Sequence, residues 1–153
     1  RSCPSALFAN SMKIIIHTDG GARGNPGPAA VGAVIEMLND KCQMSNEKPK
    51  TIEISKRIEE TTNNVAEYAA VIEALKEVKS RIQENGEIHF FLDSNLVVQQ
   101  LNGIFKVKDA NLRNLFFDVR VLEQGVGREI TYTYVPRELN KRADFLVNKA
   151  LDA

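Results

Sequence analysis

The sequence predicts an α/β domain in which helices pack on a five-stranded mixed sheet. First, three strand-like runs separated by turn-rich links open the chain, which favours an antiparallel meander. Second, the apolar spacing then changes to the helical period, and shorter strands and helices alternate to the end. Third, 153 residues with 43% hydrophobic and 26% charged side chains describe a globular chain of one-domain size.

The first three predicted elements are strands. KIIIHTD (13–19) is a β-branched run that enters the breaker-rich segment GGARGNPGP (20–28), so we expect a strand followed by a tight loop. AAVGAVIEML (29–38) and TIEISKRI (51–58) read as the second and third strands, joined through the polar stretch 39–50. Because the links are short, these strands should pair as neighbours.

The next segment has a different period. Between residues 64 and 82 the apolar side chains fall on one helical stripe. The stripe consists of Val71, Ala74, Leu75, Val78 and Ile82. EIHFFLD (87–93) then reads as a short buried strand, after a break at Asn85-Gly86, and 94–101 as a short helix.

The last third of the chain completes the pattern. Residues 110–122 carry apolar side chains at helical spacing, 129–135 alternate like a strand, and 140–151 close the chain as a helix. The predicted order is βββ-α-β-α-α-β-α, a mixed sheet with helices against it. We find no internal repeat, so we expect one domain over 12–153, preceded by a native extension or expression remnant at 1–11.

Composition excludes several classes of function. Cys3 and Cys42 lie outside any CxxC or Cys/His cluster, which argues against zinc or redox chemistry; we expect two free thiols, with a disulfide left open. No apolar run is long enough to cross a bilayer, and no signal-peptide pattern precedes the first strand. We therefore expect a soluble, cytoplasmic protein that contacts no membrane and acts as a monomer.

The charge balance is informative about partners. The chain has 20 basic and 20 acidic residues, a net charge of zero, which argues mildly against a nucleic-acid binder. An active site made of several carboxylates would itself lower the net charge. What matters for binding is therefore whether lysine and arginine gather on one face.

Two aspartates end predicted strands. Asp19 precedes two glycines, and the plain alternative is an Asp-Gly turn. Asp93 ends the strand IHFFLD, and its alternative is a cap of the following helix, made by Asp93 or Ser94. We expect the two strand ends to be adjacent in the sheet, which would bring the two carboxylates together.

Two further acids open predicted helices. Glu67 lies on the same stripe as Val71, where a carboxylate is costly unless it is paired or binds a cation. Its alternative is a capping box, with Asn64 as N-cap and Glu67 reaching back. Asp144 lies in the first turn of the last helix, where an acid also suits the helix dipole.

Taken together, the four acids indicate a metal site. Several converging carboxylates would repel one another and raise each other's pKa unless cations were present. Hard cations that prefer oxygen ligands, such as Mg²⁺ or Mn²⁺, would resolve that conflict. Two such ions can activate a water and stabilise the leaving oxygen in phosphodiester cleavage.

At this point the residues resemble a known family, type 1 ribonuclease H. Four blocks, each with its acid and in the family's order, carry the resemblance over nearly all of 12–153. They are HTDGGARGNPGPAAVGAVI (17–35), ETTNNVAEYAAVIEAL (60–75), FLDSNLVVQQLNG (91–103) and YVPRELNKRADFLVNKAL (134–151). The resemblance implies a ribonuclease H-like fold and an endonuclease that cuts the RNA strand of RNA–DNA hybrids by two-metal-ion catalysis, leaving 5′-phosphate and 3′-hydroxyl ends.

The resemblance also implies roles for single residues. Asp19, Glu67, Asp93 and Asp144 match the four metal-binding carboxylates, with Asp19 and Asp93 the most central. Positions that match substrate-contacting residues of the family are Asn25, Thr62, Asn63, Asn64 and Asn95. Small polar groups suit the 2′-hydroxyls in the wide minor groove of an A-form-like strand. For Asn63 and Asn64, helix capping alone is an equal alternative.

Two departures from the family's pattern stand out. The link 103–111 (GIFKVKDAN) replaces the basic, tryptophan-rich protrusion of many bacterial relatives, so we expect weaker hybrid binding with a steep salt dependence. The loop before Asp144 lacks the family's mobile histidine, and Arg137 is the nearest candidate for assisting product departure or contacting phosphate. We expect His17 and His89 to be packed inside strands rather than catalytic.

Three other functions compete. A junction resolvase or integrase shares clustered acids but lacks the TTNN block and the GNPGP loop. A catalytically silent hybrid-binding module would be expected to have lost an acid, and none is missing. A two-carboxylate glycosidase is disfavoured because the chain has no tryptophan to stack against sugars.

Overall fold

The computed structural model describes residues 12–39, 48–82 and 86–153, so the extension 1–11 and both cysteines lie outside the described residues. Five strands form one sheet: β1 (Met12–Ala22), β2 (Gly27–Asn39), β3 (Lys50–Thr61), β4 (Gly86–Leu92) and β5 (Glu129–Tyr134). The helices are α3 (Asn63–Arg81), α4 (Asn95–Leu101), α5 (Ala110–Val126), a short 3-10 turn η1 (Arg137–Leu139) and α6 (Lys141–Asp152).

The sheet is mixed, as predicted. Its order is β3-β2-β1-β4-β5. The first three strands pair antiparallel, which confirms the meander. β4 pairs parallel to both β1 and β5. The strands that carry Asp19 and precede Asp93 are therefore neighbours, as the sequence indicated.

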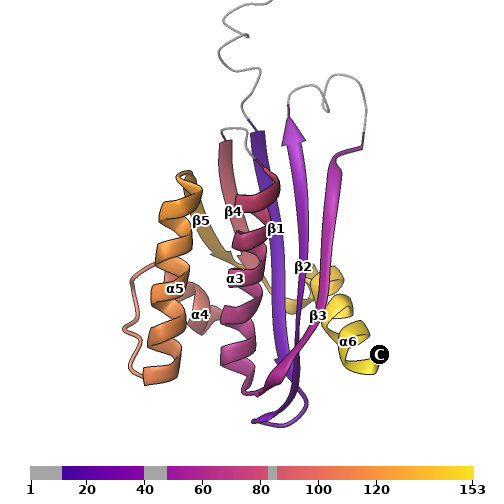
Figure 1. Cartoon of the computed structure of the whole chain (residues 1–153), viewed down its shortest axis with the longest axis vertical. Coiled ribbons are helices and arrows are strands. Elements are labelled where there is room, and N and C mark those ends of the chain that lie inside the picture. The colour runs from indigo at the N-terminus through magenta and orange to yellow at the C-terminus, as the bar shows by residue number, and fades with distance from the viewer. Residues whose placement is uncertain (1–11, 40–47, 83–85) are drawn as a thin grey trace, which may run out of the picture.

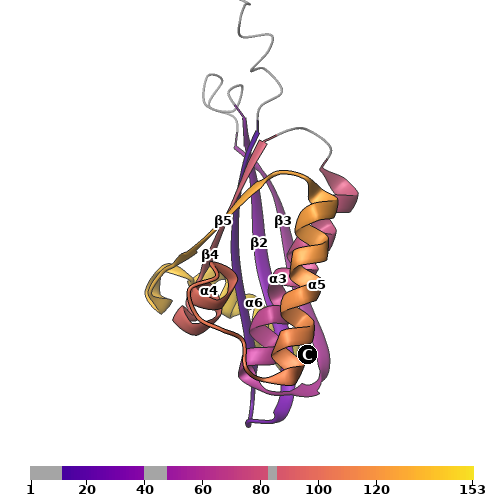
Figure 2. The same cartoon turned by 90° about the vertical axis from the view of Figure 1, so that its left-hand side faces the viewer.

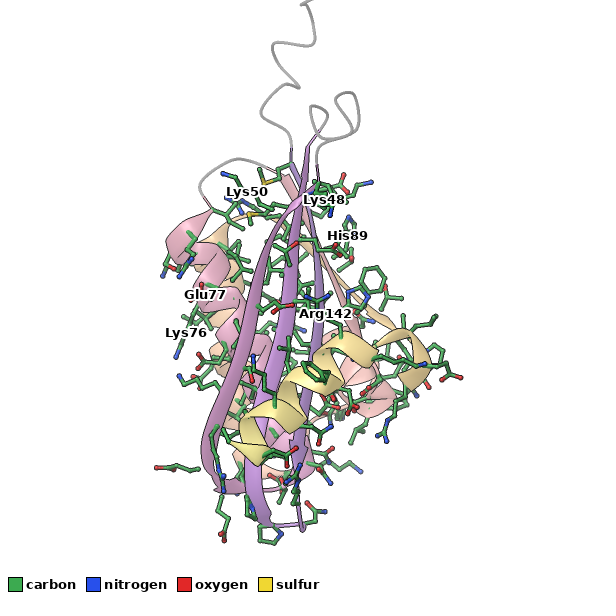
Figure 3. The ribbon with its side chains drawn as sticks, turned by 90° about the vertical axis from the view of Figure 1, so that its right-hand side faces the viewer. Lys48, Lys50, Lys76, Glu77, His89 and Arg142 are labelled. Carbon is green, nitrogen blue, oxygen red and sulfur yellow. The ribbon has the colours of Figure 1, made fainter. Side chains whose placement is uncertain are left out.

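Helices cover both faces of this sheet. α3 and α5 lie side by side over one face of the sheet (Figure 1). In the view turned by 90°, the two helices form one layer beside the sheet (Figure 2). α6 lies across β2 and β3 on the opposite face (Figure 3). The larger core packs Ile14 and Ile16 of β1 against the apolar stripe of α3, and a smaller cluster joins Ala30 to α6. The alternation of β1 thus directs successive side chains to different helices.

Some boundaries differ from those predicted. β1 does not stop at Asp19; it continues to Ala22, and Asp19 pairs with Gly32 of β2 inside the ladder. The prediction that Asp19 ends its strand, and the alternative of an Asp-Gly turn at that position, are both wrong. The turn η1 before the last helix was not predicted. No helix in the described parts of the chain is long and apolar enough to cross a membrane.

Candidate active site

The site forms where β4 ends beside β1. The β1–β4 pairing runs as far as Thr18 opposite Leu92, and among the described residues no strand pairs with β1 beyond that point on this side. Two backbone groups there bond to side chains instead. The Thr18 carbonyl accepts from Asn140 Nδ2 at 2.8 Å, and the Gly20 amide donates to Glu67 Oε1 at 3.0 Å. We call Thr18–Gly20 the open flank of β1, and Asp19 is its middle residue.

Glu67 reaches the open flank from α3. The helix is capped by Thr62, whose hydroxyl accepts from the Val65 amide at 3.3 Å. The capping box proposed from the sequence, with Asn64 as N-cap, is therefore wrong. Glu67 lies farther into the helix, is only 7% exposed, and accepts from Gly20 rather than from its own helix end.

Gly20 permits this approach. A Cβ on residue 20 would lie 2.1 Å from the carbonyl oxygen of Ala66 and 2.5 Å from the Glu67 nitrogen. Both are backbone atoms that cannot move without shifting α3. Glycine at this position therefore sets the distance between β1 and the helix that carries Glu67.

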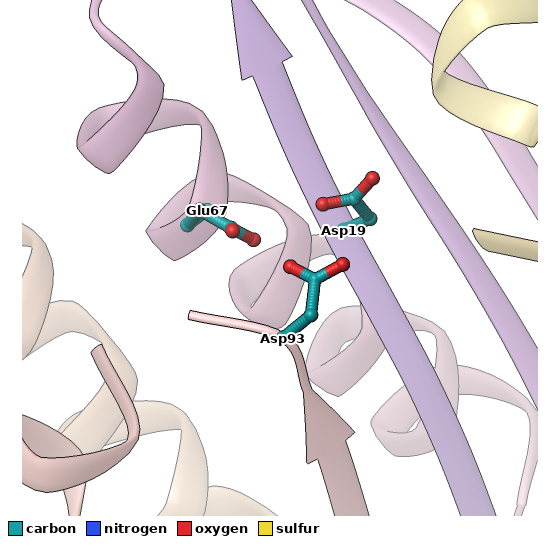
Figure 4. Close-up of side chains that lie close together, drawn as sticks. All are labelled: Asp19, Glu67 and Asp93. Carbon is teal, nitrogen blue, oxygen red and sulfur yellow. The ribbon is translucent and has the colours of Figure 1, made fainter. Parts of the chain in front are cut away.

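Asp93 comes from the end of β4. Ser94 caps α4 by accepting from the Val97 amide at 3.3 Å, so the capping role falls to Ser94 and not to Asp93. One oxygen from each of Asp19, Glu67 and Asp93 lies within 4.8 Å of the others. Figure 4 shows these three carboxylates pointing toward one another from β1, α3 and the end of β4. Three of the four predicted acids thus form one cluster.

Asp144 approaches from the other face of the sheet. It lies in the first turn of α6, is partly exposed, and comes close enough to Asp19 to share a hydrogen bond. Gly32, the cross-strand partner of Asp19, allows this: a Cβ there would lie 2.4 Å from the carbonyl oxygen of Ala143. A second glycine therefore sets the approach of the second helix.

The cluster carries an excess of negative charge that Arg137 offsets only in part. Burial, followed by the charges of Asp93 and Asp144, raises the pKa of Asp19 to about 8, while Arg137 opposes the rise. Burial and the charges of Asp19 and Asp93 likewise raise the pKa of Glu67 well above its usual value. A donor set made only of carboxylate oxygens, which repel one another in a partly buried cleft, fits hard divalent cations.

A cleft of about 380 Å³ surrounds these acids. Its walls also include Arg23, Asn63, Arg137 and Asn148. Arg23 is held at the wall by Asp152, at 2.7 Å, and by Asn148, at 3.3 Å. Sequence reasoning singled out neither Arg23 nor Asn148, although Arg23 lies within the conspicuous segment GGARGNPGP.

The predicted substrate-contacting residues fall into two groups. Asn25 and Asn63 interlock at the start of α3: Asn25 Oδ1 accepts from the Asn63 amide at 3.1 Å, and Asn63 Oδ1 accepts from the Ala22 amide at 2.8 Å. Thr62 caps the same helix end, and Asn64 lies next to it, partly buried.

The second group lies on other elements. Asn95 is exposed at the first position of α4, where its oxygen accepts from Gln99 at 3.3 Å. Arg137 is exposed in η1 and lines the cleft. The histidines lie in strands, as predicted: His17 stacks on Phe91 with ring centroids 5.2 Å apart, and His89 contacts side chains of neighbouring residues.

Comparison with known proteins places this geometry in a family. Residues 17–150 match the family described as reverse transcriptase-like. The bifunctional protein Rv2228c of Mycobacterium tuberculosis is 40% identical over 143 residues, which are 93% of this chain. The chain spans only 36% of the length of that relative.

Three solved structures match this chain over nearly the whole length of both chains. LC11-RNase H1, isolated from compost, is 41% identical with a TM-score of 0.79, over 92% of this chain and 96% of that one. The same protein in complex with an RNA/DNA hybrid gives a TM-score of 0.74 at 41% identity, over 91% and 96% of the two chains. RNase H1 from the halophilic archaeon Halobacterium salinarum is 36% identical with a TM-score of 0.77, over 92% and 98%.

Proposed function

The chain belongs to the type 1 ribonuclease H family, and from this membership we propose that it is an endonuclease that hydrolyses the RNA strand of RNA–DNA hybrids. The expected products have 5′-phosphate and 3′-hydroxyl ends. The proposal goes beyond family membership because it assigns an activity and a substrate to this particular chain. Its four acids, Asp19, Glu67, Asp93 and Asp144, are proposed as the catalytic set.

One observation carries the proposal. Carboxylates from β1, from α3 and from the end of β4 offer three oxygens within 4.8 Å of one another, in a chain 41% identical to a protein whose structure holds an RNA/DNA hybrid. A structural role does not account for this convergence, because each carboxylate raises the cost of ionising the others. The elevated pKa of Asp19 is the local sign of that cost.

We propose that the acids hold Mg²⁺ or Mn²⁺, with two ions bound when substrate is present. Asp19 and Asp93 are the central ligands, and Glu67 and Asp144 complete the set from the two faces of the sheet. Bound divalent cations supply the activated water and the stabilisation of the leaving oxygen that phosphodiester hydrolysis needs.

The chain's own residues hold this site in place. The Gly20 amide holds one oxygen of Glu67, which leaves its other oxygen for a cation or the substrate. Asp144 is partly exposed in the first turn of α6, so it can adjust as substrate enters. All four acids come from one chain, so a monomer with 12–153 as a single domain, as we propose, would contain the whole set.

The polar residues around the cleft suit a ribose-lined groove. The oxygens of Asn25 and Asn63 are engaged by backbone amides, so their Nδ2 groups are the atoms left to donate to 2′-hydroxyls or phosphates. We propose Thr62, Asn64 and Asn95 as neighbouring contacts. Arg137, on the cleft wall, is proposed to contact a phosphate of the substrate or product.

Cleavage of matched substrates tests the proposal. Hybrid, duplex RNA and duplex DNA of one sequence, each labelled on one strand, are incubated with Mg²⁺, with Mn²⁺ or with EDTA. We expect cutting of only the RNA strand of the hybrid, dependent on the cation, with 5′-phosphate ends. No hybrid cleavage with either cation would overturn the proposal, and equal cutting of duplex DNA would favour a resolvase-like enzyme.

A further inference from the structure

Asn140 occupies the N-cap position of α6, but its side chain makes no capping hydrogen bond. Asparagine at this position normally accepts a hydrogen bond from an amide in the first turn. Here its side chain accepts none from the described backbone of α6, and its Oδ1 is buried without a described partner. The residue is only 1% exposed. Burying an unpaired oxygen and leaving a helix start uncapped both cost stability, so the side chain must serve another purpose.

The amide nitrogen of Asn140 is directed to the acids instead. Nδ2 donates to the Thr18 carbonyl on the open flank at 2.8 Å, and it lies 3.4 Å from Asp93 Oδ2. These two atoms belong to the neighbouring residue of Asp19 and to Asp93 itself. One NH₂ group thus joins β1 to the carboxylate at the end of β4.

Asn140 is also tied to the fourth acid. Its backbone carbonyl accepts from the Asp144 amide at 3.1 Å, which is the first hydrogen bond of α6. A displacement of Asn140 would therefore move Asp144 relative to Asp19. The side chain fixes one acid and the main chain fixes another.

From this arrangement we propose that Asn140 is a positioning residue that orients the Asp93 carboxylate and anchors the helix bearing Asp144 on the open flank of β1. The inference rests on the proposed function, since it assigns Asn140 to the same site. It predicts that the donor group is what matters, and that its loss weakens cation binding and turnover more than hybrid binding. A residue with only a structural role would lower stability without this pattern.

Two variants test the role of the donor. Asn140→Ala removes the amide, and the isosteric Asn140→Asp replaces the donor with a carboxylate that faces the Thr18 carbonyl and Asp93. The matched control is Asn102→Ala, because Asn102 Nδ2 also donates to a strand carbonyl, that of Tyr132 at 3.1 Å, and Asn102 does not line the cleft. Thermal unfolding in EDTA first establishes a temperature at which each variant is folded.

Binding of Mn²⁺ to the protein alone, followed by electron paramagnetic resonance, is the first measurement. We expect the half-saturating Mn²⁺ concentration to rise about tenfold in Asn140→Ala, with kcat on a hybrid lowered roughly 10- to 100-fold and KM changed less than twofold. Asn140→Asp should lower kcat further despite its preserved shape. Asn102→Ala should match the parent in both Mn²⁺ binding and kcat.

The outcomes separate the two proposals. If folded Asn140→Ala or Asn140→Asp binds Mn²⁺ and turns over within twofold of the parent, the positioning role is wrong. A loss confined to KM would also overturn it. If the parent cuts no hybrid, the proposed function fails, while Mn²⁺ binding by the variants still decides whether Asn140 orients the acids. If Asn140→Ala fails to fold, Mn²⁺ binding and turnover of Asn140→Asp are compared with those of the parent instead.

Discussion

α3 and α6 bring acids to the same open flank of β1 from opposite faces of the sheet, but they do so differently. α3 has 19 residues, a side-chain cap at Thr62, and its acid buried beyond the first turn. α6 has 12 residues, no side-chain cap, and a partly exposed acid in its first turn. Both helices pack on the sheet, but the acid of α3 is buried behind a capped helix start, whereas the acid of α6 is partly exposed beside a helix start that has no side-chain cap.

This difference suggests a division of labour within the site. Glu67 belongs to the cluster with Asp19 and Asp93 and receives a backbone amide that fixes it. Asp144 lies outside that three-residue cluster, although its charge acts on Asp19. We infer that the α3 side is preformed and that the α6 side adjusts when cations and substrate bind.

The comparison of the two helices predicts its largest effect on kcat when their acids are exchanged for amides. Glu67→Gln should lower kcat on a hybrid roughly 10³-fold or more, because it removes a member of the preformed cluster. Asp144→Asn should lower kcat only about 10- to 100-fold. Single-turnover cleavage at saturating Mg²⁺ measures both. Equal losses would remove the proposed distinction between the two sides.

Substitutions at Gly20 and Gly32 test the comparison of α3 with α6 through their effects on the free energy of unfolding. Gly20→Ala should destabilise the protein by about 3 kcal/mol, since its Cβ meets backbone atoms of the well-packed α3. Gly32→Ala should cost less, about 2 kcal/mol, because α6 can shift. Gly21→Ala is the matched control, since a Cβ there meets only Val147 Cγ1 at 3.5 Å.

Urea unfolding followed by circular dichroism gives all three free energies of unfolding. The same preparations report the catalytic consequence: Gly32→Ala should lose activity out of proportion to its loss of stability, because Asp144 moves with α6. If Gly32→Ala were the more destabilising of the two, α6 would be the more rigidly seated helix and the comparison would be reversed.

The α3 and α6 sides of the site also differ in how much of each could be predicted from the sequence. The stripe through Glu67 identified α3 and its acid, because a buried carboxylate breaks an otherwise regular apolar pattern. The cap at Thr62 was missed because Asn64 fits the same local motif equally well. For Asp144 the pattern offered only a helix start, and the family resemblance carried the assignment.

Other features could not be read from local pattern at all. The glycines after Asp19 indicated a turn, whereas Gly20 is needed inside β1 for the close approach of α3. Asn140 looked like an ordinary residue at a helix start. Its partner, the Thr18 carbonyl, is 122 positions away, and a backbone acceptor leaves no trace in the sequence. Long-range contacts of this kind require the fold.

The stability of the cation-free protein should depend on pH. The pKa of Asp19 is near 3.8 when unfolded and about 8 when folded, so folding takes up a proton between these values. In EDTA, the contribution of Asp19 to the free energy of unfolding should be largest below pH 4, fall by about 2 kcal/mol or more toward pH 8, and level off above it.

Asp19→Asn should flatten this profile and raise stability at pH 8, and Mg²⁺ should stabilise the parent there. These are measured by urea unfolding at a series of pH values. If the parent and Asp19→Asn changed equally in stability from pH 4 to pH 8 in EDTA, Asp19 would not be in conflict with the other acids.

The smallest expected effect on hybrid cleavage comes from substituting Arg137 on the cleft wall. Arg137→Ala should raise KM for the hybrid roughly two- to fivefold and lower the salt slope of binding by about one, with kcat less affected. Arg142→Ala is the control, since Arg142 is also exposed but pairs with Glu53 and does not line the cleft. Equal responses of the two variants to salt would argue against a phosphate contact by Arg137.

The Asp93→Asn variant tests the central claim most directly, because Asp93 joins the acidic cluster, the end of β4 and Asn140. A strand-labelled hybrid is used to measure binding by fluorescence anisotropy and cleavage by gel in the same Mg²⁺ buffer. The account predicts that Asp93→Asn binds the hybrid within a few-fold of the parent and cuts its RNA strand at no detectable rate. Cleavage by Asp93→Asn at the parental rate would contradict the assignment of the four acids as the catalytic centre.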